Sequence, residues 1–213
     1  MTERRLAKRI VGGIYSFAAD KLYEPIVVKG TFKAFGLDEL VFEQGRKAVE
    51  VAGTAPILDM PVGTAFFTTA MALRHPGIVV GADIARGMVL KARSTAREAG
   101  TTNLVVVQAD AHHLPFPDGT FGAVGCWNGL PVMPGLVETV RELVRVLAPG
   151  GVLLASAITV PLGRMLPSRT RSHLPTMLRS VADITNVMRS MGLEVSSTRR
   201  TTLAHLIEGT KPG

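Results

Sequence analysis

Residues 56–65 read PILDMPVGTA, and this stretch decides the fold. An apolar run ends at an acidic residue, Asp59, and a Pro-Val-Gly turn follows it. Residues 64–73 then have the composition of a helix, which a His-Pro-Gly sequence closes. A buried strand, a tight turn and a helix in that order begin a βαβ unit. The stretch therefore predicts a parallel sheet with helices packed against it.

The same alternation of apolar run and helix continues to residue 158. Uninterrupted apolar strands, each followed by a helix, indicate a parallel sheet whose faces are both covered. In the second of the expected helices, Met88, Leu90, Ala92 and Ala96 are expected on the apolar side. The expected strands cover residues 56–60, 78–84, 104–108, 123–127 and 152–158, and the expected helices cover residues 64–73, 85–99 and 136–147.

The two ends of the chain follow other patterns. Residues 1–55 are helical in pattern, so we expect a helical N-terminal cap over the edge of the sheet, followed by a main domain of residues 56–213. Beyond the sheet, we expect a helix over residues 176–191 and a closing hairpin over residues 194–200 and 203–208. The predicted fold class is α/β: a Rossmann-like, doubly wound sheet, mostly parallel, with an antiparallel C-terminal hairpin.

Composition excludes several classes of protein. The 213 residues are 46% apolar and 19% charged, which excludes a disordered chain. A single cysteine, Cys126, excludes a disulfide framework and a cysteine-cluster zinc site, and we expect no metal. No apolar run reaches the roughly 18–20 residues that span a bilayer. Such a thiol-poor chain fits a cytoplasmic location.

The net charge of +7 is concentrated at the two ends. Residues 1–10 carry four basic and one acidic side chain, and residues 160–213 carry eight basic and three acidic ones. Two interpretations stay open: ordinary solvated surface, or attraction to an anionic partner. In the second case, the basic N-terminus would make a peripheral contact with a membrane.

Three acidic residues stand at or just beyond the ends of expected strands: Asp59, Asp83 and Asp110. The carboxyl ends of parallel strands meet at one rim of the sheet, where ligands bind in such folds. Asp83 follows Asp59 by 24 residues, a spacing at which a βαβ unit places an acidic residue on ribose hydroxyls. Asp110 is placed to accept from an adenine amino group. A single such aspartate is more often a helix cap or turn former, but three in register favour an adenosine site.

The turn after Asp59 narrows the choice of cofactor. A dinucleotide-binding fold needs glycines where Pro61, Gly63 and Phe66 stand. Only Gly63 meets this requirement, and Phe66 is bulky where the helix must pass close to the strand. The sequence therefore disfavours a nicotinamide cofactor.

Four stretches together resemble the class I S-adenosylmethionine-dependent methyltransferases. They are residues 58–65 (LDMPVGTA), 80–84 (VGADI), 108–121 (QADAHHLPFPDGTF) and 141–151 (RELVRVLAPGG). The last two resemble the small-molecule branch that includes ubiquinone and menaquinone methyltransferases. The resemblance covers residues 56–160 well and the C-terminal hairpin loosely. It implies S-adenosylmethionine as the cofactor.

The resemblance also implies a role for individual positions. The methionine part of the cofactor would contact the first turn, the ribose and adenine would contact the next two strand ends, and the sulfonium and the substrate entrance would lie at the end of the fourth strand. Asp59, Pro61, Gly63 and Ala65 are the positions implied for the methionine part. Asp83 is implied for the ribose, and Ile84, Asp110 and the backbone of Ala111 for the adenine. Trp127 is the position implied near the sulfonium.

The first turn departs from the family's pattern, which usually has glycine where Pro61 and Ala65 stand. Proline fixes φ near about −65° and has no N–H, so it cannot adopt a positive φ. Ala65 is expected to place a methyl group where the backbone approaches the cofactor most closely. These departures motivate an alternative: a non-catalytic or regulatory homologue that binds S-adenosylmethionine without transferring its methyl group.

Methyl transfer makes modest demands on side-chain chemistry. A sulfonium methyl is already activated, so in-line positioning supplies most of the acceleration, and a base helps when the acceptor is a phenol or hydroxyl. His112 and His113 fall in the expected adenine loop, where passive loop residues are the commoner case. His173 follows the last parallel strand among several arginines, and it is the candidate catalytic base. The predicted acceptor is an apolar small molecule such as a quinone or phenol.

A nucleic-acid methyltransferase is a further alternative, since both ends are basic. Enzymes that methylate exocyclic amino groups typically carry an Asn/Asp-Pro-Pro-aromatic motif after the fourth strand. This sequence has Asn128-Gly129-Leu130-Pro131 there, which lacks the motif. We therefore expect no nucleic-acid partner.

Overall fold

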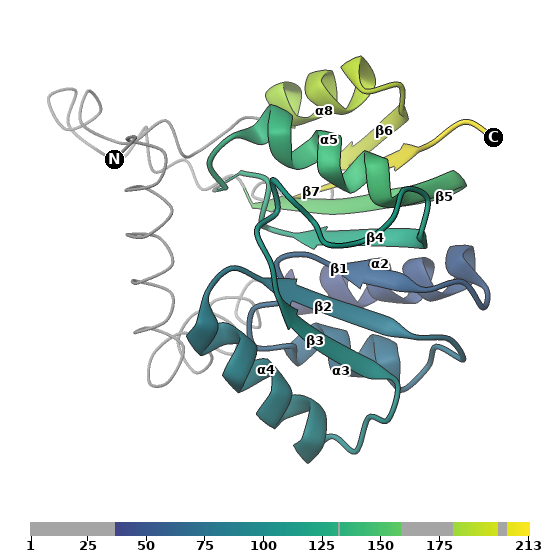
Figure 1. Ribbon diagram of the computed structural model, residues 1–213. Coiled ribbons are helices and arrows are strands. Elements are labelled where there is room, and N and C mark those ends of the chain that lie inside the picture. The colour runs from purple at the N-terminus through teal and green to yellow at the C-terminus, as the bar shows by residue number, and fades with distance from the viewer. Residues whose placement is uncertain (1–36, 132, 159–180, 200–203) are drawn as a thin grey trace, which may run out of the picture.

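The computed structural model describes residues 37–131, 133–158, 181–199 and 204–213 (Figure 1). In these ranges, every strand expected from the sequence is present, with ends that differ by a few residues. The helices are α2 (Leu37–Ala52), α3 (Phe66–Ala72), α4 (Arg86–Glu98), α5 (Leu136–Val146) and α8 (Val181–Ser190). The strands are β1 (Ile57–Asp59), β2 (Val79–Asp83), β3 (Leu104–Gln108), β4 (Phe121–Trp127), β5 (Leu147–Ile158), β6 (Glu194–Arg199) and β7 (Ala204–Thr210).

The strands form one sheet in the order β3-β2-β1-β4-β5-β7-β6. Strands β1 to β5 pair in parallel, whereas β7 runs antiparallel to both β5 and β6. This confirms the predicted fold class. Because β1 pairs with β2 on one side and β4 on the other, the chain order reverses at β1. Ligand sites in such sheets lie at the carboxyl ends of the strands beside this reversal.

The helices cover the two faces of the sheet with separate cores. On one face, α2 and α3 pack over the central strands in a cluster that includes Ile57, Met71 and Val79, and α4 extends this layer over β2 and β3. On the other face, α5 and α8 bury Leu143 and Ile184 completely. The central strands are therefore covered on both faces, which explains their uninterrupted apolar sequences.

Helix α2 does not lie where the predicted cap was expected. Its Ala48 and Ala52 are buried against a face of the sheet, and the helix packs mainly on β4, β5 and α3 rather than over an edge strand. Small residues on the buried side let the helix approach the sheet closely. The rest of the predicted cap, residues 1–36, lies outside the described residues, and the domain boundary after residue 55 stays a prediction.

Two local expectations were wrong. Leu90 is 55% exposed, whereas Val89 is buried together with Met88 and Ala92. Successive helical residues are rotated by about 100°, which puts Leu90 on the far side of α4 from Met88 and Ala92. Strand β5 was expected to begin at residue 152, but it begins at Leu147, because Leu147 already pairs with β4 ahead of an irregularity in the register.

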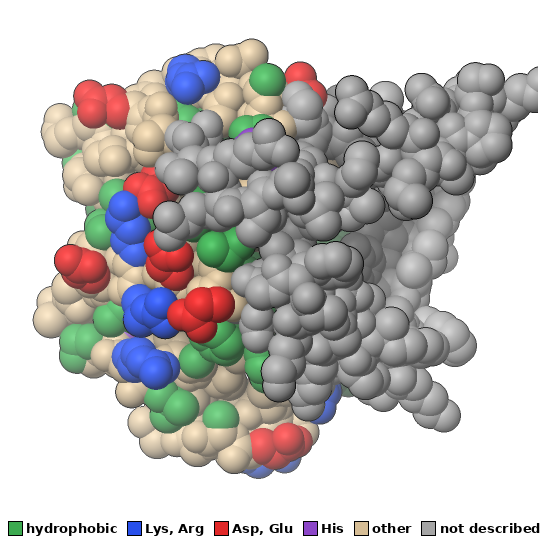
Figure 2. Space-filling view, turned by 180° about the vertical axis from the view of Figure 1, so that it is seen from behind, with side chains coloured by type: hydrophobic (Ala, Val, Ile, Leu, Met, Phe, Trp, Pro, Cys, Tyr) green, Lys and Arg blue, Asp and Glu red, His purple; other side chains and the backbone are tan. Residues whose placement is uncertain are grey.

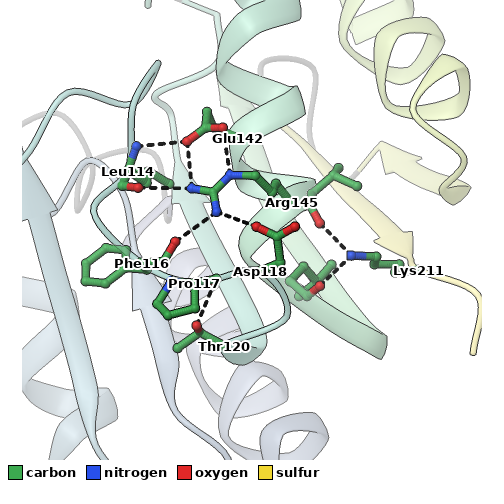
Figure 3. Close-up of polar contacts among 10 residues, drawn as sticks. Leu114, Phe116, Pro117, Asp118, Thr120, Glu142, Arg145 and Lys211 are labelled. Carbon is green, nitrogen blue, oxygen red and sulfur yellow. Dashed lines mark hydrogen bonds and ion pairs between the residues drawn. The ribbon is translucent and has the colours of Figure 1, made fainter.

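The connection from β3 to β4 contains no helix, and Arg145 of α5 holds it in place (Figure 3). The guanidinium donates to both carboxylate oxygens of Glu142, at 2.8 and 2.9 Å. It also donates to the carbonyl oxygens of Leu114 and Phe116, at 3.0 and 2.8 Å, and to the Asp118 carboxylate at 2.7 Å. An arginine has five N–H donors in a fixed plane, and here every one of them has an acceptor.

Glu142 accepts a further hydrogen bond from the Leu114 N–H at 2.9 Å. The hydrogen bonds of Arg145 and Glu142 to residues 114–118 form a clamp on this connection. The hydrogen bond from Arg145 is the main reason that the pKa of Glu142 lies below its usual value. Nearby, the Lys211 ammonium donates to the carbonyl of Val144 in α5 and to that of Leu147, the first residue of β5 (Figure 3). The sequence stretches 108–121 and 141–151 are therefore joined in space by a saturated network of hydrogen bonds.

Replacing Arg145 tests whether this clamp stabilises the fold. In the Arg145→Lys variant, an ammonium has too few donors in the wrong geometry to serve all the acceptors. We expect the free energy of unfolding, measured in urea, to fall by about 2–3 kcal/mol, the range for losing hydrogen bonds to charged groups. Arg141→Lys, at an exposed position of the same helix, is the control and should change it by less than about 0.5 kcal/mol. Equal effects of the two substitutions would contradict a stabilising role for the clamp.

Candidate functional site

Asp59 ends β1 at the rim of the sheet and is almost completely buried. Its partners in register are glycines on both neighbouring strands, Gly81 of β2 and Gly125 of β4. A side chain at Gly81 would collide with Val62, and one at Gly125 would collide with the indole of Trp127. The two glycines therefore allow Val62 and Trp127 to pack across the strands that flank Asp59.

The carboxylate of Asp59 is only partly satisfied. Its Oδ2 accepts a hydrogen bond from the Thr68 hydroxyl of α3, whereas its Oδ1 has no partner among the protein's described atoms. Burial raises the pKa of Asp59 to about 7; Thr68 works against this rise, the charge of Asp83 adds to it, and the Trp127 indole opposes it. Because an unpaired buried acceptor is costly, this position favours an incoming hydrogen-bond donor, and a cationic donor most of all.

Asp83 ends β2 and is also nearly buried. Its Oδ2 accepts from the Gly63 N–H at 3.1 Å, and its Oδ1 accepts from the Ala85 N–H at 2.9 Å. Burial raises the pKa of Asp83 to about 6, and the backbone donors of Ala85, Gly63 and Ile84 lower it. Asp83 therefore fixes the turn after β1 against the start of α4. With three backbone donors on four lone pairs, the carboxylate keeps one acceptor site for a ligand hydroxyl.

The turn after β1 adopts left-handed backbone at Gly63 (φ 53°) and Ala65 (φ 60°), but not at Pro61. A Cβ on Gly63 would meet no atom within 4 Å, so the turn is open on that side. The Ala65 methyl lies in the core with Val62 and Val89 and is fully buried. The methyl therefore points into the protein, and the left-handed backbone of Ala65 costs about 1–2 kcal/mol. A contact between the backbone of Ala65 and the cofactor stays a prediction.

Pro61 packs against the loop that follows β4. A Cβ on Gly129 would lie 2.5 Å from Pro61 Cδ and 2.8 Å from the sulfur of Cys126. Burial raises the pKa of this thiol to about 12, so Cys126 stays protonated. The proline is thus accommodated because the facing residue has no side chain.

Asp110 forms a turn at the end of β3. Its Oδ1 accepts from the His112 N–H at 3.0 Å, and its carbonyl oxygen accepts from the His113 N–H at 2.9 Å. Ala111 is buried in the core, and Ile84 is half-buried after β2, where its carbonyl accepts from the Gln108 side chain. These positions lie at the same rim as Asp59, while their contacts with an adenine stay a prediction.

The histidines considered as bases differ in their surroundings. His112 donates from Nε2 to the Pro134 carbonyl at 2.8 Å, and His113 is exposed. The candidate base, His173, lies outside the described residues. In the described part of the chain, no group of three His, Cys, Asp or Glu side chains is arranged to hold a metal ion. None of the helices in that part has the length and apolarity of a membrane span.

Sequence reasoning missed two polar residues at this rim. Thr68 is fully buried and holds Asp59; its only signal in the sequence is a Thr-Thr pair within an apolar helix. Asn128 follows β4 with a left-handed backbone (φ 57°), its N–H donates to Ser156, and its buried Oδ1 has no partner among the described residues. Asparagine is one of the few side chains that adopt this backbone conformation readily.

Known proteins resemble the part of the chain that carries this rim. Residues 57–151 match a family model described as a methyltransferase domain. A demethylmenaquinone methyltransferase of Thermus thermophilus is 42% identical over 120 residues, which are 54% of this chain and 54% of that protein. The chain spans about half the length of the curated relatives it matches.

Solved structures share the fold at low sequence identity. Magnesium protoporphyrin IX methyltransferase (ChlM) from Synechocystis, with bound SAH, has a TM-score of 0.75 and 16% identity, covering 96% of this chain and 99% of that one. The [4+2]-cyclase SpnF has a TM-score of 0.70 and 19% identity, covering 82% of this chain and 80% of that one. Since proteins of different activity share it, the fold alone does not select a reaction.

The two buried carboxylates predict how stability depends on pH. A carboxyl whose pKa is higher in the folded than in the unfolded protein takes up a proton on folding between the two values. For Asp59 the window runs from 3.8 to about 7, and for Asp83 from 3.8 to about 6. In each window the free energy of unfolding falls as pH rises, by at most about 1.4 kcal/mol per pH unit and proton.

We therefore expect the Asp59→Asn variant to be more stable than the wild type at pH 8 and to lose part of this pH dependence. The neutral amide keeps an acceptor for Thr68 and cannot ionise. Urea unfolding at half-unit steps from pH 4 to 8 measures both effects. Asp183→Asn, at an exposed site on α8, should keep the wild-type slope. A variant at residue 59 with the wild-type slope would show that Asp59 is ionised throughout.

Proposed function

We propose that this chain, whose residues 57–151 match a methyltransferase domain model, is a class I methyltransferase that binds S-adenosylmethionine and transfers its methyl group to an apolar small molecule. The match of these residues to the methyltransferase model carries the proposal. The two buried carboxylates at the point where the strand order reverses support it independently. A quinone or a phenol is the acceptor class that we favour, in line with the relatives' names.

The residues at the rim fit such a cofactor. The unpaired Oδ1 of Asp59 suits the α-ammonium group of a methionine moiety, since it needs a donor and a cation favours its charged form. The open side of Gly63 leaves room for a ligand to approach the backbone. Asp83 keeps an acceptor site for a ribose hydroxyl. Ile84, Asp110 and Ala111 would contact the adenine at the neighbouring strand ends.

When bound, S-adenosylmethionine supplies a methyl group that is already activated by the positive sulfonium. The task of this chain's residues is then to bind and orient. Asp83 holds the turn through the Gly63 N–H, and Asp59 is held by Thr68, so both carboxylates are fixed before a ligand arrives. Preorganised positioning of two reactants is the main source of acceleration in such a transfer. A base role for His173, a membrane contact through the basic N-terminus and a cytoplasmic location stay predictions.

A homologue that binds the cofactor without transferring its methyl group is the second candidate. The observation that favours it is the turn itself, in which Ala65 holds a left-handed backbone and Pro61 replaces a glycine. Methyl transfer to any member of a panel of quinols and phenols would exclude this candidate. Cofactor binding without transfer to any of them would support it.

Calorimetric titration with S-adenosylhomocysteine tests the cofactor site. We expect a dissociation constant in the micromolar range, which corresponds to about −8 kcal/mol. The Asp83→Asn variant should bind at least about tenfold more weakly, since charge-assisted hydrogen bonds are lost, while thermal unfolding verifies that it is folded. Asp183→Asn is the matched surface control. Absence of binding to the wild type, or unchanged binding to Asp83→Asn, would refute the assignment.

The affinity for S-adenosylhomocysteine should also depend on pH. Burial raises the pKa of Asp59 to about 7, and an ammonium ligand favours the ionised carboxylate. The dissociation constant should therefore fall as pH rises from about 6 to about 8, by up to about tenfold per unit below the pKa. Asp59→Asn should bind weakly with a flat profile. A wild-type profile that is flat over this range would show that the ligand does not meet Asp59.

A further inference from the structure

A cavity of about 370 Å³ lies between α2 and α3, on the face of the sheet that carries Asp59. Its volume falls in the range of small-molecule sites, roughly 300–1,000 Å³. Its apolar wall includes Phe42, Phe67, Met71 and Trp127. The rings of Phe42 and Phe67 meet edge to face, with centroids 5.1 Å apart. The wall is therefore suited to an apolar ring, which such side chains contact favourably.

Trp127 joins this cavity to the rim of the sheet. It ends β4, its indole lies across Gly125, and Gly125 is the register partner of Asp59. Because Asp59 and Gly125 are register partners on adjacent strands, the indole that lies across Gly125 is beside Asp59. A molecule that fills the cavity would therefore contact the residue that the resemblance places beside the reacting sulfonium.

The polar part of the lining carries more positive than negative charge, with two arginines against one glutamate. Arg46 pairs with Glu39 at 3.0 Å, but both side chains are largely exposed, and such pairs contribute little. Arg74 donates to the Ala70 carbonyl at 3.0 Å, and no carboxylate of the described residues pairs with it. Figure 2 views the molecule from the side opposite to Figure 1. On the described part of this surface, Lys and Arg side chains lie among acidic and apolar ones.

We propose that this cavity binds the methyl acceptor, and that the acceptor is an apolar, ring-bearing molecule with an anionic group. The ring would lie against Phe42, Phe67 and Trp127, and the anion would be held by Arg74 with help from Arg46. Arginine recognises both carboxylate and phosphate, so the anion belongs to one of these two classes. The proposal rests on the proposed function and narrows its acceptor class.

Fluorescence of Trp127 reports on the cavity directly, because it is the only tryptophan in the chain. Excitation at 295 nm allows titration of the full-length protein with three matched probes that do not absorb there: 4-phenylbutyrate, 4-phenylbutyl phosphate and 4-phenylbutanol. We expect saturable changes, with at least about fivefold tighter binding of one or both anions than of the alcohol. The preferred anion identifies the class of the charged group.

Substitution of Arg74 tests the charge. In Arg74→Gln, the affinity for the anions should fall most of the way to that for the alcohol, while binding of the alcohol is unchanged. Arg97→Gln, at an exposed position of α4 outside the cavity, should bind all three probes like the wild type. Equal affinity of the wild type for anions and alcohol, or an Arg74→Gln variant that behaves like the wild type, would overturn the anionic assignment.

Calorimetry with S-adenosylhomocysteine separates this proposal from the proposed function. Probe binding that persists when S-adenosylhomocysteine is bound supports an acceptor site beside the cofactor. Displacement of the probe by S-adenosylhomocysteine would overturn it, since the cavity would then be part of the cofactor site. If no probe changes the fluorescence of a protein that binds S-adenosylhomocysteine, the assignment of the cavity as the acceptor site is overturned and the cofactor site is unaffected. Probe binding without S-adenosylhomocysteine binding would instead remove the proposed function, and the acceptor assignment with it.

Discussion

The guanidinium of Arg145 constrains the β3–β4 connection, the segment that carries the Asp110 turn of the rim. The connection from β3 to β4 has no helix of its own, so its backbone carbonyls are not paired within a regular helix. Arg145 satisfies two of them, those of Leu114 and Phe116, and is itself held by Glu142 and Asp118. With this segment fixed, Leu114 is buried in the core and the Asp110 turn stays at the rim.

The buried carboxylates at the rim make the ligand-free fold less stable, and they favour the binding of a cationic ligand. Asp59 and Asp83 are both buried, and burial raises the pKa of each carboxyl, so their charged forms are unfavourable in the folded protein without a ligand. The same burial removes water from the site, which strengthens any interaction with a cationic ligand. A substitution such as Asp59→Asn is therefore expected to stabilise the fold and to weaken cofactor binding. This opposition is common at functional sites.

The two departures from glycine in the first turn are accommodated by different means. Pro61 fits because Gly129, on the loop after β4, has no side chain to meet its ring. Ala65 fits because its methyl group packs into the core with Val62 and with Val89 of α4, although its backbone remains left-handed. Neither residue places its side chain where it would block the open side of Gly63. The turn can therefore keep its shape with a different sequence.

Several features followed from the sequence alone. Apolar runs with Asp59, Asp83 and Asp110 at or just beyond their ends were enough to predict parallel strands and a shared rim, because parallel strands all present their carboxyl ends to one side. The stretches 108–121 and 141–151 carried the resemblance to methyltransferases, and the match of residues 57–151 confirms it. These features depend on local order and spacing, which a sequence displays directly.

Other features were decided only by tertiary structure. The helical pattern of α2 did not reveal that the helix covers a face of the sheet, because an apolar stripe on a helix does not indicate which surface it packs against. Neither the pairing of Thr68 with Asp59 nor the bonds from Arg145 to residues 114–118 could be seen from spacing, since they join elements that only folding brings together. The same holds for the cavity that Phe42 of α2, Phe67 of α3 and Trp127 of β4 line jointly. A sequence determines which faces are apolar and which strand ends are charged, while the contacts across elements depend on how those faces pack.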